Sequence, residues 1–336
     1  MMTKENELFD EEFWSEKKVL ITGGTGSFGV AFLHECMMMI DNLAEVRVFS
    51  RDEKKQDDLR KMFPHEKVRF IIGDVRDRES VDKAMIGVDY VFHAAALKHV
   101  PTGENHPYET VKTNVIGSHN VIESAIANKV KKVVVLSTDK AVNPTCAMGM
   151  TKGLMEKCAL ARCEDSETDI CVTRFGNVMG SRNSVIPLFA EQIRSGKVAT
   201  ITNPDMVRYM MTMSQAQRQV VFAFEHGRTG DTIVLDTPAA DVMTVFRAVW
   251  KIVRPFDDLE AAKTPYIVIG NRRGEKMIES LVTDEEREYA LPINTRFGSV
   301  YCIPYHRNLQ QFAFPDKPKM LTVEQLKTLI LETGVL

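Results

Sequence analysis

Residues 17–29 read KKVLITGGTGSFG and join a short β-branched run to a glycine-rich turn. The turn matches GxGxxG from Gly24 to Gly29, and Gly23 adds one more glycine. The pattern has little specificity alone, but here it follows a predicted strand and opens a predicted helix from Ser27 to about Met39. Glycines let the backbone approach a diphosphate, which free amides and the positive helix end then bind. The stretch therefore predicts a dinucleotide-binding turn.

Short β-branched runs and helical stretches continue to alternate after this turn, which indicates parallel βαβ units. We predict an α/β fold with a doubly wound parallel (Rossmann) sheet over residues 16–180 and a smaller α/β substrate lobe over 181–336, with some later segments returning to the first domain. The predicted strands lie within 17–24, 45–50, 68–75, 89–96, 131–139 and 169–178, and the longer helices within 52–62, 107–128 and 145–163.

Composition excludes several classes of protein. The net charge of −3 argues against a nucleic-acid binder. Six cysteines without a CxxC pair indicate reduced thiols in a cytoplasmic protein, and eight scattered histidines give no metal-ligand spacing, so we expect no metal. The N-terminus lacks the apolar core of a signal peptide, and no run is apolar enough for a membrane span. Phe9, Phe13 and Trp14 would pack against either the domain or a second subunit.

The end of the second predicted strand bears on cofactor choice. NAD sites tend to carry an acid there, which accepts a hydrogen bond from the 2′-hydroxyl. This chain has Ser50 and Arg51, which suit a 2′-phosphate, so we expect NADP rather than NAD. Asp52 leaves NAD open, because a small shift would make it the ribose acid. Asp74 and Val75 are placed to touch the adenine, and the small Ala94–Ala96 let the cofactor lie close to the backbone.

Residues 137–144 read STDKAVNP at the carboxyl end of the fifth predicted strand, where ligands bind in such folds. Asp139 and Lys140 offer one acid and one base there, although an exposed ion pair at a loop start is the alternative. Met148 and Lys152 follow four residues apart and share one helix face. Short-chain dehydrogenases carry YxxxK at this place, so Met148 stands where their acid–base tyrosine does and has no proton to supply.

The chain resembles the UDP-N-acetylglucosamine 4,6-dehydratases, over about residues 17–276, and looks like a form without membrane anchors. The resemblance implies an NADP-dependent lyase of surface polysaccharide biosynthesis that acts on a UDP-sugar, and a homo-oligomer. It is carried, in order, by the motifs AAALKHVP (94–101), STDKAVNPT (137–145), MGMTK (148–152), RFGNVMGSR (174–182), SVIPLF (184–189), ITNPDMVRYMM (201–211) and RRGEK (272–276).

The resemblance also implies roles for single residues. Thr138, Asp139, Lys140 and Lys152 would line the reacting centre, and Asn114 would support the catalytic lysine. With the turn and strand-end residues above, the expected cofactor set is Gly23, Gly26, Ser27, Phe28, Gly29, Ser50, Arg51, Asp74, Val75, Ala94, Ala95, Lys98, Asn114 and Lys152. The expected substrate set is Lys98, Arg174, Asn177, Arg182, Val185, Thr202, Met206, Arg208, Arg272 and Glu275, with Arg208 on the diphosphate and with Arg272 and Glu275 reaching the diphosphate and the uridine ribose.

The implied reaction oxidises C4 of the sugar, removes the C5 proton with Lys140, protonates the departing C6 hydroxyl with Asp139, and reduces C6. The proton acceptor for the first step is open once tyrosine is absent, and so are the configuration at C5 and the identity of the UDP- or GDP-linked sugar. Two alternatives remain. A nucleotide-sugar 4-epimerase would share the cofactor site and the first hydride step, and a non-catalytic NADP-binding regulator would account for the missing tyrosine.

Overall fold

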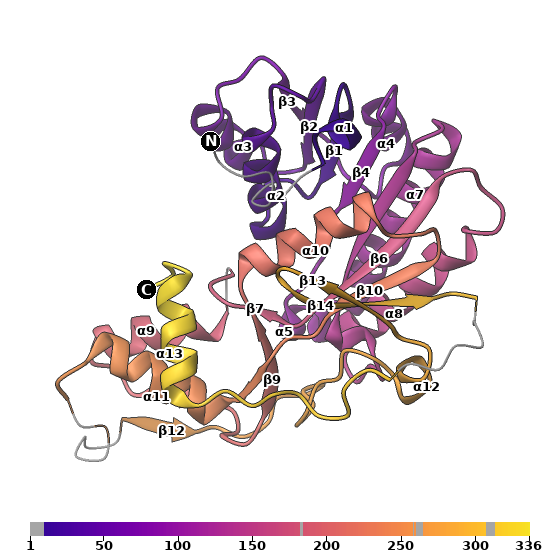
Figure 1. The fold of residues 1–336 in the computed structure, drawn as a ribbon. Coiled ribbons are helices and arrows are strands. Elements are labelled where there is room, and N and C mark those ends of the chain that lie inside the picture. Colours follow the sequence, from indigo (N-terminus) through magenta and orange to yellow (C-terminus); the bar gives the residue numbers. More distant parts are fainter. Residues whose placement is uncertain (1–9, 182–183, 258, 260–264, 307–312) are drawn as a thin grey trace.

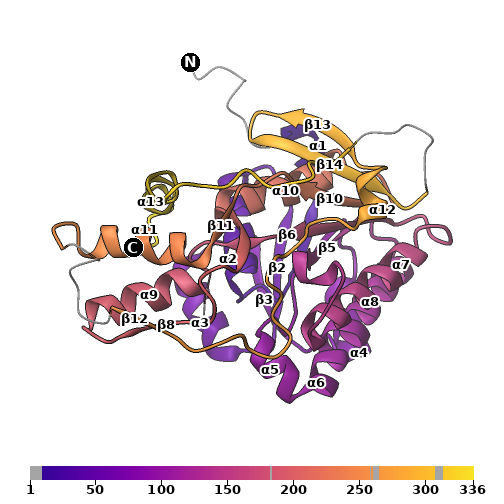
Figure 2. The same cartoon turned by 90° about the horizontal axis from the view of Figure 1, so that it is seen from below.

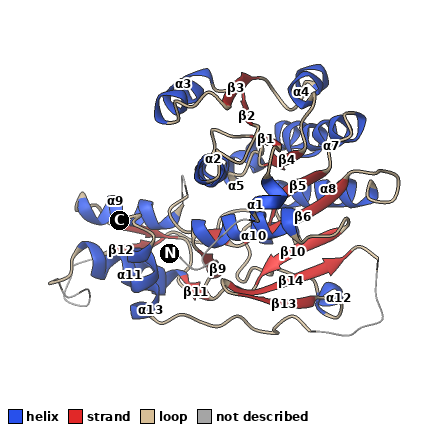
Figure 3. Cartoon of the chain, turned by 45° about the horizontal axis from the view of Figure 1, so that its top comes forward, coloured by secondary structure: helices blue, strands red, loops and turns tan. Residues whose placement is uncertain are grey.

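The computed structural model describes residues 10–181, 184–257, 259, 265–306 and 313–336. Its centre is one large sheet of nine strands within these residues (Figures 1 and 3). The strands, given in their order across the sheet, are β13 (Leu291–Thr295), β14 (Gly298–Pro304), β10 (Asp231–Leu235), β6 (Asp169–Phe175), β5 (Lys132–Thr138), β4 (Tyr90–His93), β1 (Lys18–Thr22), β2 (Glu45–Ser50) and β3 (Val68–Ile72).

The seven strands from β10 to β3 pair in parallel, and β14 and β13 add an antiparallel edge. The order 3-2-1-4-5-6 belongs to doubly wound dinucleotide-binding sheets. The predicted fold class is therefore confirmed.

Helices cover both faces of this sheet, because successive strand residues point to opposite sides. Val19 and Ile21 join the core on one face and Leu20 joins the core on the other. The first face carries α2 (Ser27–Met38), α3 (Glu53–Met62) and α10 (Met213–Glu225), and the second carries α4 (Arg78–Met85), α7 (Gly117–Ala127) and α8 (Ala147–Ala161), which lie together in Figure 2.

The helix predicted over 107–128 is divided into three segments. It consists of α6 (Pro107–Val111), a π-helical turn (Lys112–Ile116) and α7. A π-turn inserts an extra residue into an α-helix and often marks a functional site. Here the π-turn contains Asn114, which is fully buried.

The chain after residue 180 contributes to two regions. One gathers apart from the main sheet in Figure 1, and the other returns to it, since α10, β10, β13 and β14 all come from this part. The separate region contains α9 (Val185–Arg194), α11 (Val242–Val253) and α13 (Val323–Glu332), with the short strands β7 (Asn177–Val178), β8 (Ala199–Ile201), β9 (Val207–Met211), β11 (Ala239–Asp241) and β12 (Tyr266–Val268). The remaining short helices are α5 (Val100–Asn105) and α12 (Asp284–Arg287). Among the helices in the described ranges, none is both long and apolar enough to cross a bilayer.

The short helix α1 (Glu11–Trp14) packs against the same chain. Trp14 is fully buried, and its indole nitrogen donates a 2.7 Å hydrogen bond to the Glu225 carboxylate on α10. Phe13 stacks on Tyr90 of β4 at 4.9 Å between ring centroids. Phe9 lies outside the described residues. The N-terminal aromatic residues that the structure describes thus extend the core of the first sheet face.

We predict that Trp14→Ala lowers the free energy of unfolding by about 3–5 kcal/mol, because it empties a buried aromatic site and leaves Glu225 without its indole donor. Urea unfolding followed by circular dichroism measures this change. Phe256→Ala is the control, since Phe256 is 98% exposed and should unfold at the midpoint of the parent protein. Equal midpoints for the two variants would contradict the assignment of Trp14 to the core.

Candidate functional site

The predicted site residues converge because parallel strands end at one edge of the sheet. The glycine turn follows β1, Ser50 ends β2, Ala94 follows β4, Thr138 ends β5 and Asn177 comes just after β6. Ligands of open α/β sheets bind in the crevice outside this edge. Segments far apart in sequence thus meet at one place.

The glycine turn has the shape of a diphosphate cradle. The Gly26 amide donates a 2.9 Å hydrogen bond to the Gly23 carbonyl, and Gly26 is the N-cap of α2. Gly23 has a φ of +66°, and a Cβ there would lie 2.6 Å from the Ala95 backbone. A Cβ on Gly29 would lie 2.4 Å from the Gly24 Cα. These close approaches and the positive helix end suit a dinucleotide diphosphate.

The side chains at the ends of β2 and β3 bear on whether the ribose site suits NAD or NADP. Asp52 is the N-cap of α3, where its carboxylate accepts a hydrogen bond from the Lys55 amide. Arg51 keeps a half-exposed side chain, 3.4 Å from the Asp74 carboxylate. Burial disfavours the charge of Asp74, but Arg76 and Arg51 outweigh it and hold its pKa below the usual range. The Ser50 hydroxyl is buried and accepts a bond from Gln56. Arg51 is therefore the cation presented beside the predicted cofactor edge.

The residues after β5 form a compact acid–base group. Asp139 is fully buried, and its Oδ1 atom accepts hydrogen bonds of 2.9 Å from the Thr138 hydroxyl and of 2.9 Å from the Lys140 ammonium. Its Oδ2 atom is buried and has no hydrogen-bond partner within the described part of the chain. A buried oxygen of this kind is costly unless something binds it. Asp139 thus has one oxygen held in place and one available to a ligand.

Lys140 is a cation in this arrangement. Burial opposes its charge, but the carboxylates of Asp139 and Glu279 prevail and raise the pKa of Lys140 above its ordinary value, while Arg208 reduces the effect. The ammonium also lies 3.4 Å from the Asn177 side-chain oxygen. Lys140 cannot accept a proton until it loses its own, which constrains the implied role as base.

Met148 and Lys152 both point inward from α8, with 4% of each residue exposed. Burial lowers the pKa of Lys152 to about 8, although Glu156 opposes the shift. The Lys152 ammonium donates a 2.6 Å hydrogen bond to the Leu136 carbonyl. Lys152 is therefore fixed on the backbone of β5, close to the loop that carries Asp139 and Lys140.

Asn114 ties the loop after β4 to α8. Its side chain pairs with both backbone groups of Leu97, at 2.8 and 3.0 Å, and donates to the Thr151 hydroxyl at 3.1 Å. Asn114 thus meets the residue before Lys152 and not the lysine itself. Lys98 follows Leu97 and is exposed at this edge. The clamp fixes the backbone on which Lys98 stands.

A second buried residue next to this clamp is His93 at the end of β4. Its ring nitrogens lie 2.6 Å from the Thr22 hydroxyl and 2.7 Å from the Ser118 hydroxyl. Burial, reinforced by Lys152, lowers the pKa of His93 to about 3, so the ring is neutral. Because Ser118 donates to the Asn114 carbonyl, it accepts from the ring Nε2–H, and Nδ1 accepts from Thr22. His93 is a fixed structural link between β1 and the π-turn.

Arg174 differs from its expected role in substrate binding. It is 5% exposed, and its guanidinium binds the carboxylates of Glu156 at 2.7 Å and Glu286 at 2.6 Å. Glu156 also accepts a hydrogen bond from Ser137. These bonds occupy the fork that a diphosphate would need, so we drop Arg174 from the substrate set. Its position in a buried strand explains the difference, since such an arginine needs internal carboxylates.

Arg208 is among the other expected substrate residues, and its charge acts on Lys140. The Arg208 guanidinium donates to the Val207 carbonyl at 2.8 Å and contacts the Met206 sulfur at 3.3 Å, which also accepts a hydrogen bond from Thr202. Arg272 and Glu275 form an exposed turn, in which the Glu275 carboxylate accepts from the Arg272 amide. Val185 packs at the start of α9 with the separate lobe, and Arg182 lies outside the described residues.

Glu279 lies outside every motif quoted from the sequence, whereas its partner Lys276 ends the RRGEK motif. Glu279 is 3% exposed, and its carboxylate lies 3.6 Å from the Lys140 ammonium and 2.8 Å from that of Lys276. Lys276 also donates a 2.8 Å hydrogen bond to the Val142 carbonyl. Glu279 stands 139 positions after Lys140 with no motif around it, so that only the fold brings them together.

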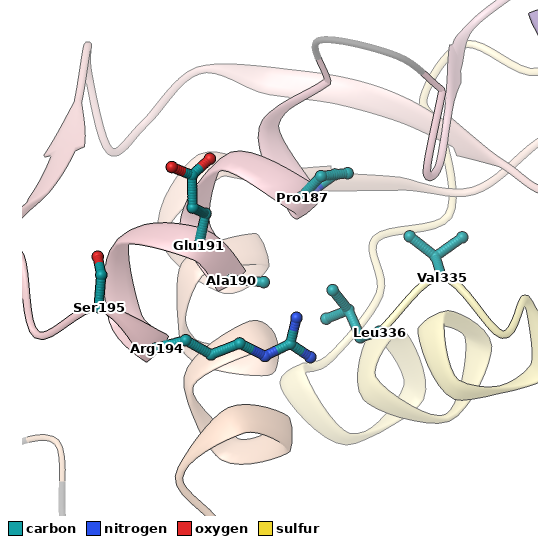
Figure 4. A pocket seen from close by; sticks show the side chains of 7 residues that line it. All are labelled: Pro187, Ala190, Glu191, Arg194, Ser195, Val335 and Leu336. Carbon is teal, nitrogen blue, oxygen red and sulfur yellow. The ribbon is translucent and has the colours of Figure 1, made fainter.

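A pocket of about 450 Å³ lies away from these residues, between α9 and the C-terminal residues (Figure 4). Its lining includes Arg194, whose guanidinium extends toward Leu336. None of the expected site residues lines it. In the described ranges, no group of three histidine, cysteine, aspartate or glutamate side chains is placed to hold a metal ion.

The comparisons with known proteins agree with this architecture. A curated protein of Rickettsia akari (strain Hartford), named UDP-glucose 4-epimerase, is 50% identical over 294 residues, which cover 86% of this chain and 83% of the relative. The X-ray structure of Pen from Bacillus thuringiensis is 37% identical and covers 96% of this chain and 99% of its own, with a TM-score of 0.88.

A more distant structure shares the fold alone. It is DesIV, a dTDP-glucose 4,6-dehydratase from Streptomyces venezuelae with NAD and TYD bound, at 20% identity and a TM-score of 0.72 over 94% of this chain and 96% of its own. The family described as polysaccharide biosynthesis protein matches residues 19–300. With the glycine turn, the sheet order and the acid–base loop in place, the chain belongs to the polysaccharide biosynthesis protein family.

Proposed function

We propose that the chain dehydrates a UDP-N-acetylhexosamine such as UDP-N-acetylglucosamine across C5 and C6, with NADP as a regenerated cofactor, to give a 4-keto-6-deoxy sugar. The observation that carries the proposal is the Asp139–Lys140 couple, whose oxygen and nitrogen are 2.9 Å apart, beside a buried methionine in place of tyrosine. Elimination next to a ketone needs a proton donor and a proton acceptor close together. The couple supplies both.

The chain's own residues would act in a definite order. A nicotinamide cofactor held at the glycine turn would supply the oxidation at C4 and the reduction at C6. Transfer of one proton from the Lys140 nitrogen to Asp139 would convert the ion pair into a neutral amine and a neutral acid. The amine then takes the C5 proton, and Asp139 gives its proton to the C6 hydroxyl, which leaves as water. Asp139 regains its charge as water leaves. Once the hydride has reached C6, the Lys140 ammonium would give a proton back to C5, and Lys140 would regain its charge from solvent, which balances the proton released at C4.

The couple also offers a path for the C4 hydroxyl proton. Met148 has no proton to exchange, whereas the Thr138 hydroxyl bonds to Asp139 at 2.9 Å. The unpartnered Oδ2 atom of Asp139 is a further acceptor in the same place. Asp139, directly or through Thr138, is therefore our assignment for this step. That proton would pass on to solvent before Asp139 takes up the Lys140 proton and acts as the acid.

A 4-epimerase acting on a UDP-hexose is the second candidate. It is favoured by the name of the Rickettsia akari relative, which is 50% identical over most of both chains. An epimerase would use the same cofactor edge and one proton acceptor at C4, but would return the hydride to C4 on the opposite face. It gives no role to a neighbouring base such as Lys140, which is why the site favours dehydration.

NADP is our proposed cofactor because of how β2 ends. Asp52 caps α3, which directs its carboxylate to an amide of the helix, while Arg51 remains half exposed beside the edge. An arginine in this position suits a 2′-phosphate, whereas NAD sites tend to place an acid there.

Product analysis tests the reaction. We expect incubation of the NADP-loaded protein with UDP-N-acetylglucosamine to give a nucleotide sugar lighter by one water, read by mass spectrometry. A product of unchanged mass and altered C4 configuration in the NMR spectrum would replace our proposal with the epimerase. Nucleotide binding without any turnover of UDP-N-acetylglucosamine or UDP-glucose would refute both.

Asp139→Asn should lower turnover by about a hundredfold or more, because an amide cannot donate or accept the proton. NADP binding, measured by calorimetry, should stay unchanged, since the substitution keeps the shape of the side chain. Asp165→Asn is the control, because Asp165 has an exposed side chain and forms a surface pair with Arg162. An Asp139→Asn protein with the turnover of that control would rule out the assigned role.

Arg51→Ala should weaken NADP binding by about tenfold or more and leave NAD binding nearly unchanged, since hydrogen bonds to charged groups contribute about 1.5–3 kcal/mol. Lys54→Ala is the matched control, because Lys54 is an exposed cation on α3 paired with Asp58. Titration calorimetry with both cofactors measures the effect. If the parent protein prefers NAD, or if both variants lose NADP equally, Arg51 does not read the 2′-phosphate.

A further inference from the structure

The turn and strand segment from residue 272 to 279 docks directly on the catalytic loop. The Thr145 hydroxyl donates a 2.9 Å hydrogen bond to the Gly274 carbonyl, and Lys276 donates to the Val142 carbonyl at 2.8 Å. Gly274 has a φ of +79°, and a Cβ there would lie 2.7 Å from the Cys146 Cβ. The segment can therefore approach the loop this closely because it has glycine at the point of contact.

Glu279 ends this segment inside the protein. Its two carboxylate oxygens face two different lysines, Lys140 at 3.6 Å and Lys276 at 2.8 Å, while the residue is only 3% exposed. A buried carboxylate is tolerated when it is paired in this way, and breaking such a pair is costly. The two lysines come from different segments, Lys140 from the loop after β5 and Lys276 from residues 272–279. Glu279 therefore links the later segment to the Asp139–Lys140 couple.

The charges around Lys140 come from four segments. Asp139 and Glu279 are negative, Arg208 of β9 and Lys276 are positive, and Cys146 at the start of α8 is a neutral thiol whose pKa burial raises. We propose that Glu279 is a positioning residue that holds the Lys140 ammonium beside Asp139 and keeps it protonated until the sugar is bound. Lys276 pairs with the same carboxylate and so weakens its attraction for Lys140.

The proposal deepens the proposed function, on which its catalytic consequence rests. The amine form of Lys140 arises when one proton passes from its nitrogen to the Asp139 oxygen 2.9 Å away, with no other bond changed. The Glu279 carboxylate stabilises the ammonium and so opposes this transfer. The raised pKa of Lys140, in which Asp139 and Glu279 outweigh burial, is consistent with this opposition.

The experiment is a pH titration of the Lys140 side chain by NMR in the full chain labelled with ¹⁵N-lysine, in which Lys140→Met identifies the signal. We expect Glu279→Gln to lower the pKa of Lys140 by about one pH unit or more, because an opposite charge at this distance has been removed. Lys276→Met should raise it, because Glu279 then has Lys140 as its remaining cation in this group. A loss of packing would not move the two variants in opposite directions.

Glu288→Gln is the charge-matched control, since Glu288 is exposed and lies nine positions after Glu279. It should titrate as the parent protein does, and NADP binding should persist in all three variants if they fold. A Lys140 titration in Glu279→Gln equal to that in Glu288→Gln would overturn the proposal, and so would shifts of the same sign in Glu279→Gln and Lys276→Met.

Turnover provides the second readout. If the amine form of Lys140 arises by proton transfer to Asp139, the couple must keep one proton in all, so turnover falls with pH once Lys140 loses its proton to solvent. The falling limb should therefore move to lower pH in Glu279→Gln. A limb that stays in place while the NMR titration moves would leave Glu279 as the group that sets the charge of Lys140 and would refute Lys140 as the base. If no UDP-sugar is turned over by the parent protein, the proposed function fails, and the titration still decides the role of Glu279.

Discussion

The ion pair between Lys140 and Asp139, held from behind by Glu279, determines what chemistry this fold can perform. Both carboxylates are buried, and the side chain of the lysine between them is 21% exposed. Removing three charges from water is expensive, and such groups persist where their mutual pairing compensates the loss. An ion pair at 2.9 Å is one proton transfer away from an acid and a base. In the reaction that we propose, this contact would hold the acid and the base of the elimination in their charged, unreactive forms.

The sheet brings Asp139 and Lys140 to its carboxyl edge, and a later part of the chain adds Glu279 to this ion pair. The turn after β1 and the loop after β5 share one edge, so a dinucleotide bound at the turn would lie near Asp139. Residues 272–279 then close the other side through Thr145, Val142 and Lys140. In the proposed reaction, the cofactor edge and the acid–base couple belong to the sheet, whereas Glu279, which we propose controls the charge of the couple, comes from a segment more than a hundred residues later.

The sequence predicts the local features and misses the long-range ones. The glycine turn, the strands from β1 to β6 and the Asp139–Lys140 pair follow from periodicity and position at strand ends, because these depend on neighbouring residues. Glu279 and the internal pairing of Arg174 depend on which segments pack together, and no spacing records that. Arg174 appeared suited to a diphosphate because a guanidinium can bind phosphate oxygens. Its strand is buried, however, and its guanidinium is paired with two glutamates.

Dehydratase and epimerase share everything up to the ketone, so the fate of the hydride separates them. The direct measurement uses UDP-N-acetylglucosamine carrying deuterium at C4, with NMR of the product. Our account predicts that the deuterium is found at C6, since the hydride removed from C4 returns to the carbon from which water has left. Deuterium that remains at C4 of an inverted sugar would contradict the account.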